Sequence, residues 1–333
     1  MALPKPIWKQ LRSPTHYYWL IALQGVLTLV LLVVLYRLVS AHPNLRASWD
    51  SLKTHLNQAS WASMLLPVLL LLPNWLLETA KWRLLVRITH PIPFLTAFRA
   101  VLIGVGFSII TPQRVGEYGG RLILLPPDAR WAGINAKIAG NAAQVLILVG
   151  FGGPAAILLG IQMGLLNLLL VICISAAFTL LFTLALYFFF RPALLKKMIL
   201  ARHWPDWIKQ RLRPVGSLFH FPVSALAHVL LLSLMRYAIY CCQYILLLNL
   251  FNIMPGPTDA CIGVAAIFFW QTMLPLTTVA GLAVRGNLAV WIWGFYGADA
   301  VNSLGASLFL WIINLILPAL IGTLIFFRVQ LTK

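Results

Sequence analysis

Long apolar runs recur along most of this chain and constrain its fold more than any other feature. They approach or exceed the roughly 20 residues that an α-helix needs to cross a bilayer, and they extend from Tyr17 to Phe327. Only 10% of the 333 residues are charged, whereas soluble domains carry about a quarter. No polar stretch between the runs is long enough for a soluble catalytic domain. The sequence therefore predicts an all-α polytopic membrane protein.

Hydropathy predicts eight apolar segments. They cover residues 17–39, 61–79, 94–111, 132–160, 165–190, 223–251, 260–281 and 299–327. The third segment is short and ends at a proline-containing stretch, and the seventh is interrupted by Pro275 and Gly281. Because these residues break helices, neither segment is expected to cross the bilayer fully. The first segment follows three basic residues, but it is too long for a typical signal peptide and is expected to stay as a helix.

The basic residues lie mainly between the apolar segments and give the chain a formal charge of +18. Cytoplasmic loops of membrane proteins are enriched in Lys and Arg, so this charge indicates membrane orientation rather than nucleic-acid binding. The most basic loop, Arg191 to Arg213, should be cytoplasmic together with the N-terminus, and it could also form an amphipathic helix on an anionic leaflet. Eight full crossings would place this loop outside. Six crossings plus two re-entrant elements, one from each face, place it inside.

This arrangement divides a single membrane domain, residues 1–333, into an inverted repeat with halves at about 15–160 and 165–328. The breaks at Pro112 and Pro275 occupy corresponding places in the two halves. Paired interrupted segments indicate a transporter's binding site. Such breaks also occur in membrane helices without a transport role, so a purely structural interpretation stays open.

Charged residues surround the break in the first half. Pro112 and Gly116 are the predicted helix-breaking residues, and Arg114, Glu117 and Arg121 lie beside them. Charges at membrane depth should face a cavity or each other. Glu117 could hold both arginines by ion pairing, and an arginine pair fixed in this way can bind a phosphate. The alternative is a basic interfacial loop that only orients the protein.

The second half repeats part of this pattern. Pro275 and Gly281 are the predicted structural breaks, and Arg285 follows them without an acidic neighbour in sequence. Arg285 is therefore either an anchor at the outer face or a ligand for an anionic group.

Arg236 lies inside the apolar run 223–251 and is the most costly charge in the chain if it is at mid-membrane. Glu117, Asp259, Asp299 or a bound phosphate could pair with it. The sequence does not choose among these partners.

The remaining candidates favour structural roles. Glu78 and Lys81 form an i,i+3 pair that could close on itself at the membrane interface. The histidines and the four cysteines show no metal-binding spacing, so neither a metal nor a cofactor is expected. No Walker loop is present to support ATP-driven transport by this chain alone.

Several short motifs in order resemble those of the lysylphosphatidylglycerol synthase transmembrane (flippase-like) family. These motifs are Lys81-Trp82-Arg83-Leu84-Leu85, Thr111-Pro112-Gln113-Arg114-Val115-Gly116-Glu117 with Arg121, Leu274-Pro275, and Gly281-Leu282-Ala283-Val284-Arg285. The resemblance covers about residues 15 to 328. It implies movement of a lipid or lipid-linked substrate, in a multi-pass protein of the bacterial inner membrane.

Two features of the chain depart from this family. Its second motif normally ends in arginine-glutamate, but Gly286 follows Arg285 here, and Ala280 stands where a glycine is common. Arg285 therefore lacks its usual partner. Nothing resembles the aminoacyl-transferring domain of the fused synthases, so lysyl transfer is not expected.

Two functions of different classes remain. The first is a translocator of an anionic phospholipid or lipid-linked glycan, with Arg114, Arg121, Arg236 and Arg285 contacting phosphate and Glu117 orienting the arginines. The second is a membrane scaffold or partner subunit of a glycolipid or polysaccharide synthesis complex, which implies a glycosyltransferase partner. A third hypothesis is a membrane-embedded transferase, for which Glu117 is the sole candidate base.

Overall fold

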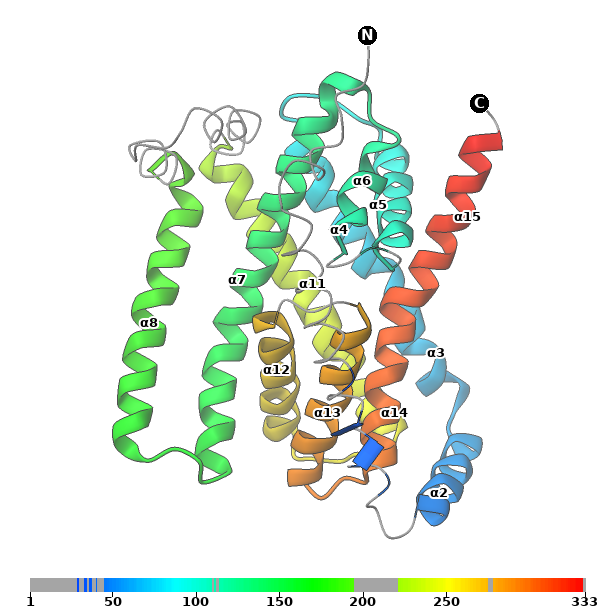
Figure 1. Cartoon of the computed structure of the whole chain (residues 1–333), viewed down its shortest axis with the longest axis vertical. Coiled ribbons are helices and arrows are strands. Elements are labelled where there is room, and N and C mark those ends of the chain that lie inside the picture. Colours follow the sequence, from blue (N-terminus) through cyan, green and yellow to red (C-terminus); the bar gives the residue numbers. More distant parts are fainter. Residues whose placement is uncertain are drawn as a thin grey trace.

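A computed structural model describes residues 45–109, 111, 114–194, 221–274 and 278–331, together with positions 29, 33, 34, 36, 37 and 40. All regular structure within these residues is helical (Figure 1). The helices of the first half are α2 (Leu45–Gln58), α3 (Trp61–Leu69), α4 (Leu71–Val86), α5 (Phe94–Ile109), α6 (Gly116–Leu122) and α7 (Arg130–Gln162). Those of the second half are α8 (Leu168–Phe190), α11 (Val223–Leu250), α12 (Pro257–Met273), α13 (Thr278–Phe295), α14 (Ala300–Trp311) and α15 (Leu317–Leu331). A 3₁₀ turn, Pro127–Ala129, precedes α7, and a π-helix, Ile312–Ile316, joins α14 to α15.

Five helical segments of the described chain are long and apolar enough to cross a membrane. They are Trp61–Val86, Pro127–Gln162, Leu168–Phe190, Val223–Leu250 and Ala300–Leu331. Each coincides with a predicted crossing. An apolar run of this length can satisfy its backbone hydrogen bonds in lipid only as a helix. The predicted first crossing, residues 17–39, lies almost entirely outside the described residues. The all-α polytopic membrane fold is thereby confirmed.

Two helix pairs lie in opposite halves of the molecule. Figure 1 shows α5 and α6 in the upper half and α12 and α13 in the lower half. None of these four helices is among the candidate spans. We call α5–α6 the upper hairpin and α12–α13 the lower hairpin. Their placement matches two re-entrant elements from opposite faces, while the internal repeat itself stays a prediction.

The predicted breaks fall differently in the two hairpins. Pro112 and Pro275 lie outside the described residues. Gly116 is the first residue of α6. Gly281, which was expected to interrupt the seventh segment, instead lies within α13. That prediction was wrong, because a glycine inside a helix costs only about 1 kcal/mol relative to alanine and does not have to end it.

The long helix of each half packs on the hairpin of the other half. Helix α7 lies against α12, and α15 lies against α5. A Cβ atom on Gly152 would come within 2.5 Å of the Phe269 Cβ, and one on Gly322 would clash with the Leu102 carbonyl oxygen. Such close backbone approach, which only glycine permits, is a common way for membrane helices to associate. These contacts hold the hairpins between the spans.

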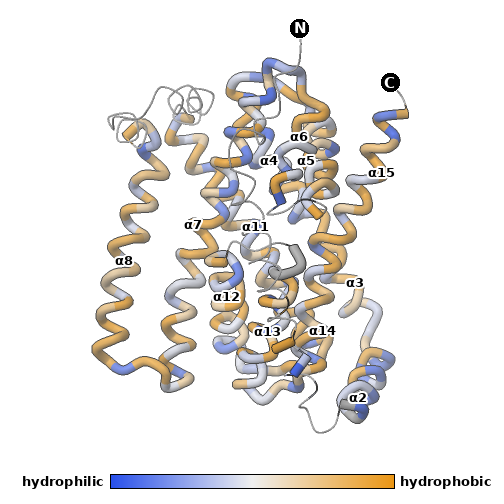
Figure 2. The backbone as a smooth tube through the Cα atoms, viewed as in Figure 1, coloured by the Kyte–Doolittle hydropathy of each residue, from blue (hydrophilic) through white to orange (hydrophobic). Residues whose placement is uncertain are grey.

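Helix α8 lies at the edge of the bundle. None of its residues is buried, and Figure 2 shows that it is apolar along nearly its whole length. A helix that is apolar on all sides and exposed in the protein is suited to face lipid. The functional site must therefore be sought in the bundle formed by the other helices.

Candidate functional site

A cavity of about 470 Å³ lies between the two hairpins. Its wall includes residues of α4, α6, α7, α11, α12, α13 and the π-helix. The charged residues that line it are Glu78, Arg114, Glu117, Lys137, Arg236 and Arg285. Aromatic and amide side chains complete the wall, among them Trp75, Tyr240 and Gln271. Both halves of the chain therefore contribute charge to one space.

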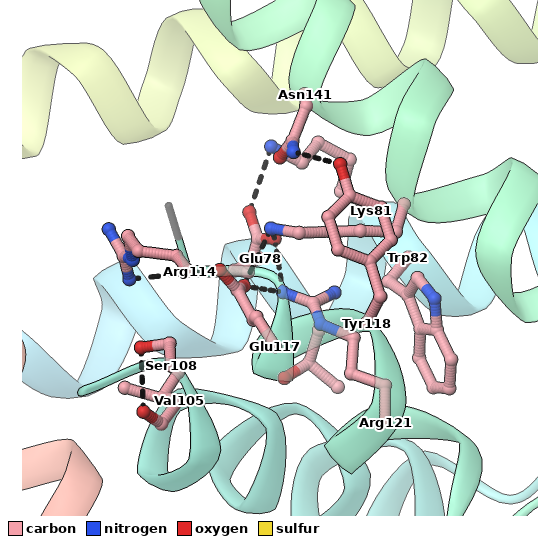
Figure 3. Close-up of polar contacts among 12 residues, drawn as sticks. Glu78, Lys81, Trp82, Val105, Ser108, Arg114, Glu117, Tyr118, Arg121 and Asn141 are labelled. Atoms are coloured by element: carbon pink, nitrogen blue, oxygen red, sulfur yellow. Dashed lines mark hydrogen bonds and ion pairs between the residues drawn. The ribbon is translucent and has the colours of Figure 1, made fainter. Parts of the chain in front are cut away.

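Glu78 of α4 is the centre of the charged cluster (Figure 3). Its side chain is only 3% exposed. One carboxylate oxygen is 2.8 Å from Arg121 Nη2, and the other is 2.8 Å from Lys81 Nζ and 2.9 Å from Arg236 Nη1. A carboxylate that loses its water is stable only when partners such as these replace it. Glu78 thus ties α4 to α6 and α11.

Glu117 of α6 is the second carboxylate of the cluster. Its oxygens lie 2.7 Å from Arg121 Nη2, 2.6 Å from Lys137 Nζ and 3.7 Å from Arg114 Nη2. A buried carboxylate is stable only when nearby cations replace its lost hydration, and Lys137 and Arg121 do so here. Glu117 thus links α6 to α7.

The local sequence explains how α6 reaches this position. Thr111 Oγ1 donates to the Phe107 carbonyl and accepts from the Gly116 N–H, which fixes the turn before α6. A Cβ on Gly120 would lie 2.7 Å from the Gly104 Cα, so α6 can lie directly on α5 only because both residues are glycines. This close packing directs Glu117 and Arg121 toward α4.

Arg114 occupies an unusual backbone conformation. Its φ angle is +58°, in the left-handed region that residues with a Cβ rarely adopt. The side chain is 46% exposed and lines the cavity. Strained conformations of this kind concentrate at functional sites. The backbone of Arg114 is thus consistent with a positioned ligand-binding residue.

Arg236 is held by a chain of polar groups that crosses the bundle. Besides Glu78, its Nε donates to Asn74 Oδ1 at 2.7 Å. Asn74 donates in turn to Asn314 at 2.7 Å, and Asn314 donates to Gln243 at 3.1 Å. Asn314 belongs to the π-helix, an element that is frequent at functional sites. The π-helix thus directs an amide toward the site.

The partner of Arg236 is not one of the carboxylates considered from the sequence. Asp259 accepts instead from Gln162 at 3.0 Å, and Asp299 caps α14. Glu78 pairs with Arg236 because α4 packs against α11, a contact that sequence spacing cannot reveal. The aromatic rings of Trp75 and Tyr240 flank the Arg236 guanidinium at 5.3 and 5.4 Å, within cation–π range.

Arg285 of α13 lines the same cavity from the lower hairpin. Among the described residues no carboxylate forms an ion pair with it, and its buried Nε has no hydrogen-bond acceptor. Of the two roles considered for it, the position favours a ligand for an anionic group over an anchor at the outer face. This role is consistent with the sequence, in which Gly286 rather than an acidic residue follows Arg285.

Two features of the cluster differ from the sequence-based interpretation. The Glu78–Lys81 pair does form, but it is buried rather than interfacial. Lys137 was not identified, although it binds Glu117 at 2.6 Å. Lys137 is the single charged residue of the apolar segment 132–160, and a lone charge in such a segment is a signal for a functional position.

The arrangement is suited to bind an anion at membrane depth. Cations from the turn before α6 and from α7, α11 and α13 converge on one cavity, and two carboxylates hold several of them in place. Guanidinium groups offer paired donors that match phosphate and carboxylate oxygens.

Comparison with known proteins identifies the family but no individual relative. No curated protein and no solved structure matches the chain. The family model described as lysylphosphatidylglycerol synthase TM region matches residues 20–322, which is nearly the whole chain. The shared region includes both hairpins and every charged residue of the cavity. The protein therefore belongs to the family of the lysylphosphatidylglycerol synthase TM region.

Proposed function

We propose that this protein translocates an anionic lipid, or a lipid-linked glycan, between the leaflets of the membrane. The observation that carries the proposal is one cavity with Arg114 beside the upper hairpin and Arg285 on the lower hairpin. The hairpins come from opposite faces of the bundle (Figure 1). A headgroup could thus meet a cation whichever side it enters from.

The energetics of headgroup transfer support this role. A charged headgroup in the bilayer interior loses its hydration, which costs several kcal/mol or more per charge. Cations already placed at membrane depth replace that hydration without further rearrangement. Glu78 and Glu117 pair with Arg114, Lys137 and Arg236 and reduce the repulsion among these three cations.

The wall of the cavity suits an amphipathic substrate. Trp75, Tyr240 and Phe268 lie beside the cations. Aromatic side chains present an apolar surface next to a polar site. Such a wall would accommodate the part of the lipid adjacent to its phosphate while the acyl or isoprenoid chain remains in the bilayer.

The distribution of basic residues supports an orientation for this transport. Arg87, Arg99 and Arg130 are exposed at the end of the bundle where α4 ends and where α5 and α7 begin. Asp259 and Asp299 lie at the opposite end, at the starts of α12 and α14. By the positive-inside rule, the arginine-rich end is cytoplasmic. This would place the protein in a bacterial inner membrane with a cytoplasmic N-terminus.

Leaflet exchange in proteoliposomes tests the proposal. Purified protein is reconstituted with fluorescent anionic lipids, and wild type is compared with Arg114→Ala and Glu117→Gln at equal protein density. Arg99→Gln is the matched control, because Arg99 is exposed on the same hairpin and does not line the cavity. We expect both cavity variants to lose exchange and the control to retain it.

The opposite outcome has a defined meaning. Folded wild-type protein that exchanges no anionic lipid would favour a non-enzymatic scaffold in a glycolipid or polysaccharide synthesis complex. Such a scaffold should co-purify with a glycosyltransferase.

A further inference from the structure

The cavity contains more positive than negative charge. Four cations line it, and they face two carboxylates, Glu78 and Glu117. The four cations are Arg114, Lys137, Arg236 and Arg285. The wall thus carries two positive charges in excess. Lys81 and Arg121 bind the same two carboxylates from behind the wall and add to this excess.

Such an excess is costly at membrane depth. An uncompensated ion in a low-dielectric interior destabilises the protein, even after the protein relaxes around it. A bound anion that supplies one negative charge would offset only half of the excess on the wall. An anion that supplies two charges would offset the excess on the wall, and the charges of Lys81 and Arg121 behind the wall also favour the larger negative charge.

Unused donors identify where the additional charge is recognised. The Nε of Arg285 in α13 and the Nε2 of Gln271 in α12 are both buried and have no acceptor among the described residues. Both side chains line the cavity. A buried donor without an acceptor is destabilising. Oxygen atoms of a ligand in the cavity would satisfy these groups once the two side chains turn toward it.

The position of Arg285 relative to Arg114 adds a second constraint. Arg114 and Arg285 line the same cavity, each beside a different hairpin. Two cations that line one cavity favour an anion between them.

We propose that the cavity selects a phosphate group that carries two negative charges, as in a phosphomonoester or pyrophosphate headgroup, over a phosphodiester. This inference rests on the proposed lipid translocation and specifies its substrate class. A phosphomonoester carries about −1.5 to −2 at neutral pH and presents three strong acceptor oxygens, whereas a phosphodiester carries a single charge. Arg285 and Gln271 determine the preference, because they hold the unused donors.

Binding to the purified protein in nanodiscs of neutral lipid tests this proposal. Phosphatidic acid is compared with phosphatidylmethanol of the same acyl chains, which differs by one methyl group and one charge. Inorganic pyrophosphate is the soluble probe. One charge-assisted hydrogen bond is worth about 1.5–3 kcal/mol, so we expect phosphatidic acid to bind at least about tenfold tighter than phosphatidylmethanol.

Variants locate the source of the preference. In Arg285→Gln the ratio between the two lipids should fall to about two- to threefold, since one of the charges that distinguishes them is gone. Arg130→Gln, at an exposed position outside the cavity, should retain the full ratio. A ratio unchanged by Arg285→Gln would overturn the assignment of selectivity to the lower hairpin.

The remaining outcomes separate this proposal from the proposed function. Equal affinity for phosphatidic acid and phosphatidylmethanol would contradict the selectivity for two charges but leave anionic-lipid translocation intact. Failure of folded protein to bind either lipid would contradict translocation itself. Pyrophosphate binding without any lipid binding would show that the source of the phosphate is soluble and would overturn the lipid assignment.

Discussion

The two hairpins supply charge to the same cavity in different ways. In the upper hairpin, Glu117 binds Arg121 and Lys137 at 2.7 and 2.6 Å, so the cations are compensated by the protein itself. In the lower hairpin, Arg285 has no carboxylate partner among the described residues. The upper charges are thus part of the structure that holds the helices together. The lower charge is available to a ligand.

The space around the glycines also differs between the upper hairpin and part of α13. A Cβ on Gly104 or Gly120 of the upper hairpin would approach its neighbours within 2.8 Å, whereas one on Gly281 or Gly294 of α13 meets nothing within 4 Å. The close contact between α5 and α6 therefore requires glycine. In the lower hairpin, a Cβ on Gly263 of α12 would likewise lie 2.6 Å from Trp293 of α13, so the open space in α13 is local to Gly281 and Gly294.

The largest expected effect comes from removing the central carboxylate. Glu78→Gln leaves Lys81, Arg121 and Arg236 without their shared counter-charge, and breaking a buried ion pair typically costs about 3–5 kcal/mol. We expect a strongly lowered melting temperature in detergent, measured by intrinsic tryptophan fluorescence. Asp50→Asn is the control, because the Asp50 side chain is 73% exposed in a pair with Lys53 at 3.7 Å. If Glu78→Gln melted like wild type, the cluster would not hold the helices together.

Substitution of glycines should give a smaller effect that is confined to close contacts. Gly120→Ala and Gly322→Ala each force a methyl group into neighbouring backbone, and overpacking of this kind costs about 1–3 kcal/mol. Gly294→Ala in α13 should be neutral or slightly stabilising, because the space is open and alanine favours helix. The same melting experiment compares them. A loss of stability in Gly294→Ala as large as in Gly120→Ala would contradict the difference in packing between these two positions.

Neutralising one arginine in each hairpin should separate stability from activity. Arg121→Gln removes partners of both carboxylates and should destabilise the protein, whereas Arg285→Gln should leave the melting temperature unchanged or raise it. Lipid exchange by Arg285→Gln should nevertheless fall about tenfold, the equivalent of about 1.4 kcal/mol. The two variants are compared by melting and by exchange in the same lipid mixture. Equal destabilisation by both would indicate that Arg285 has a structural partner.

The smallest effect is expected for the amide chain that supports Arg236. Asn314→Leu leaves Asn74 and Gln243 each without one partner, at a cost of about 1 kcal/mol. Exchange should weaken modestly, because Glu78 still binds Arg236 directly. Asn249→Leu makes the same change at an exposed position of α11 and should have no effect on exchange. A complete loss of exchange in Asn314→Leu would give the π-helix a more direct role than positioning.

The sequence predicted the elements whose signals are local. Apolar runs longer than a bilayer crossing identified the spans, and the spacing of Glu117 from Arg114 and Arg121 predicted pairs that the helix α6 and its preceding turn do form. Hydropathy combined with loop charge also placed two incomplete crossings where the hairpins occur. These predictions depend on residues close together in the chain.

The centre of the cluster could not be predicted in this way. Glu78, Lys137 and Arg236 lie on three different spans and meet only because α4, α7 and α11 pack together. The i,i+3 relation of Glu78 to Lys81 suggested a self-contained pair, but the carboxylate also serves Arg121 and Arg236. Lys137 and Arg236 each carried a visible signal, as the single Lys, Arg, Asp or Glu in a long apolar segment.

Photo-crosslinking tests the central claim most directly, because it reports where the headgroup lies. A phosphatidic acid with a photoreactive group near its phosphate is incorporated into nanodiscs with the protein, and crosslinked peptides are identified by mass spectrometry. The account predicts crosslinks to cavity residues such as Tyr240 and Gln271 that unlabelled phosphatidic acid displaces and that Arg285→Gln diminishes. Helix α8, which has no buried residue, should show only crosslinks that the competitor does not displace. Crosslinks confined to α8 and the other lipid-facing surfaces would contradict a headgroup site between the hairpins.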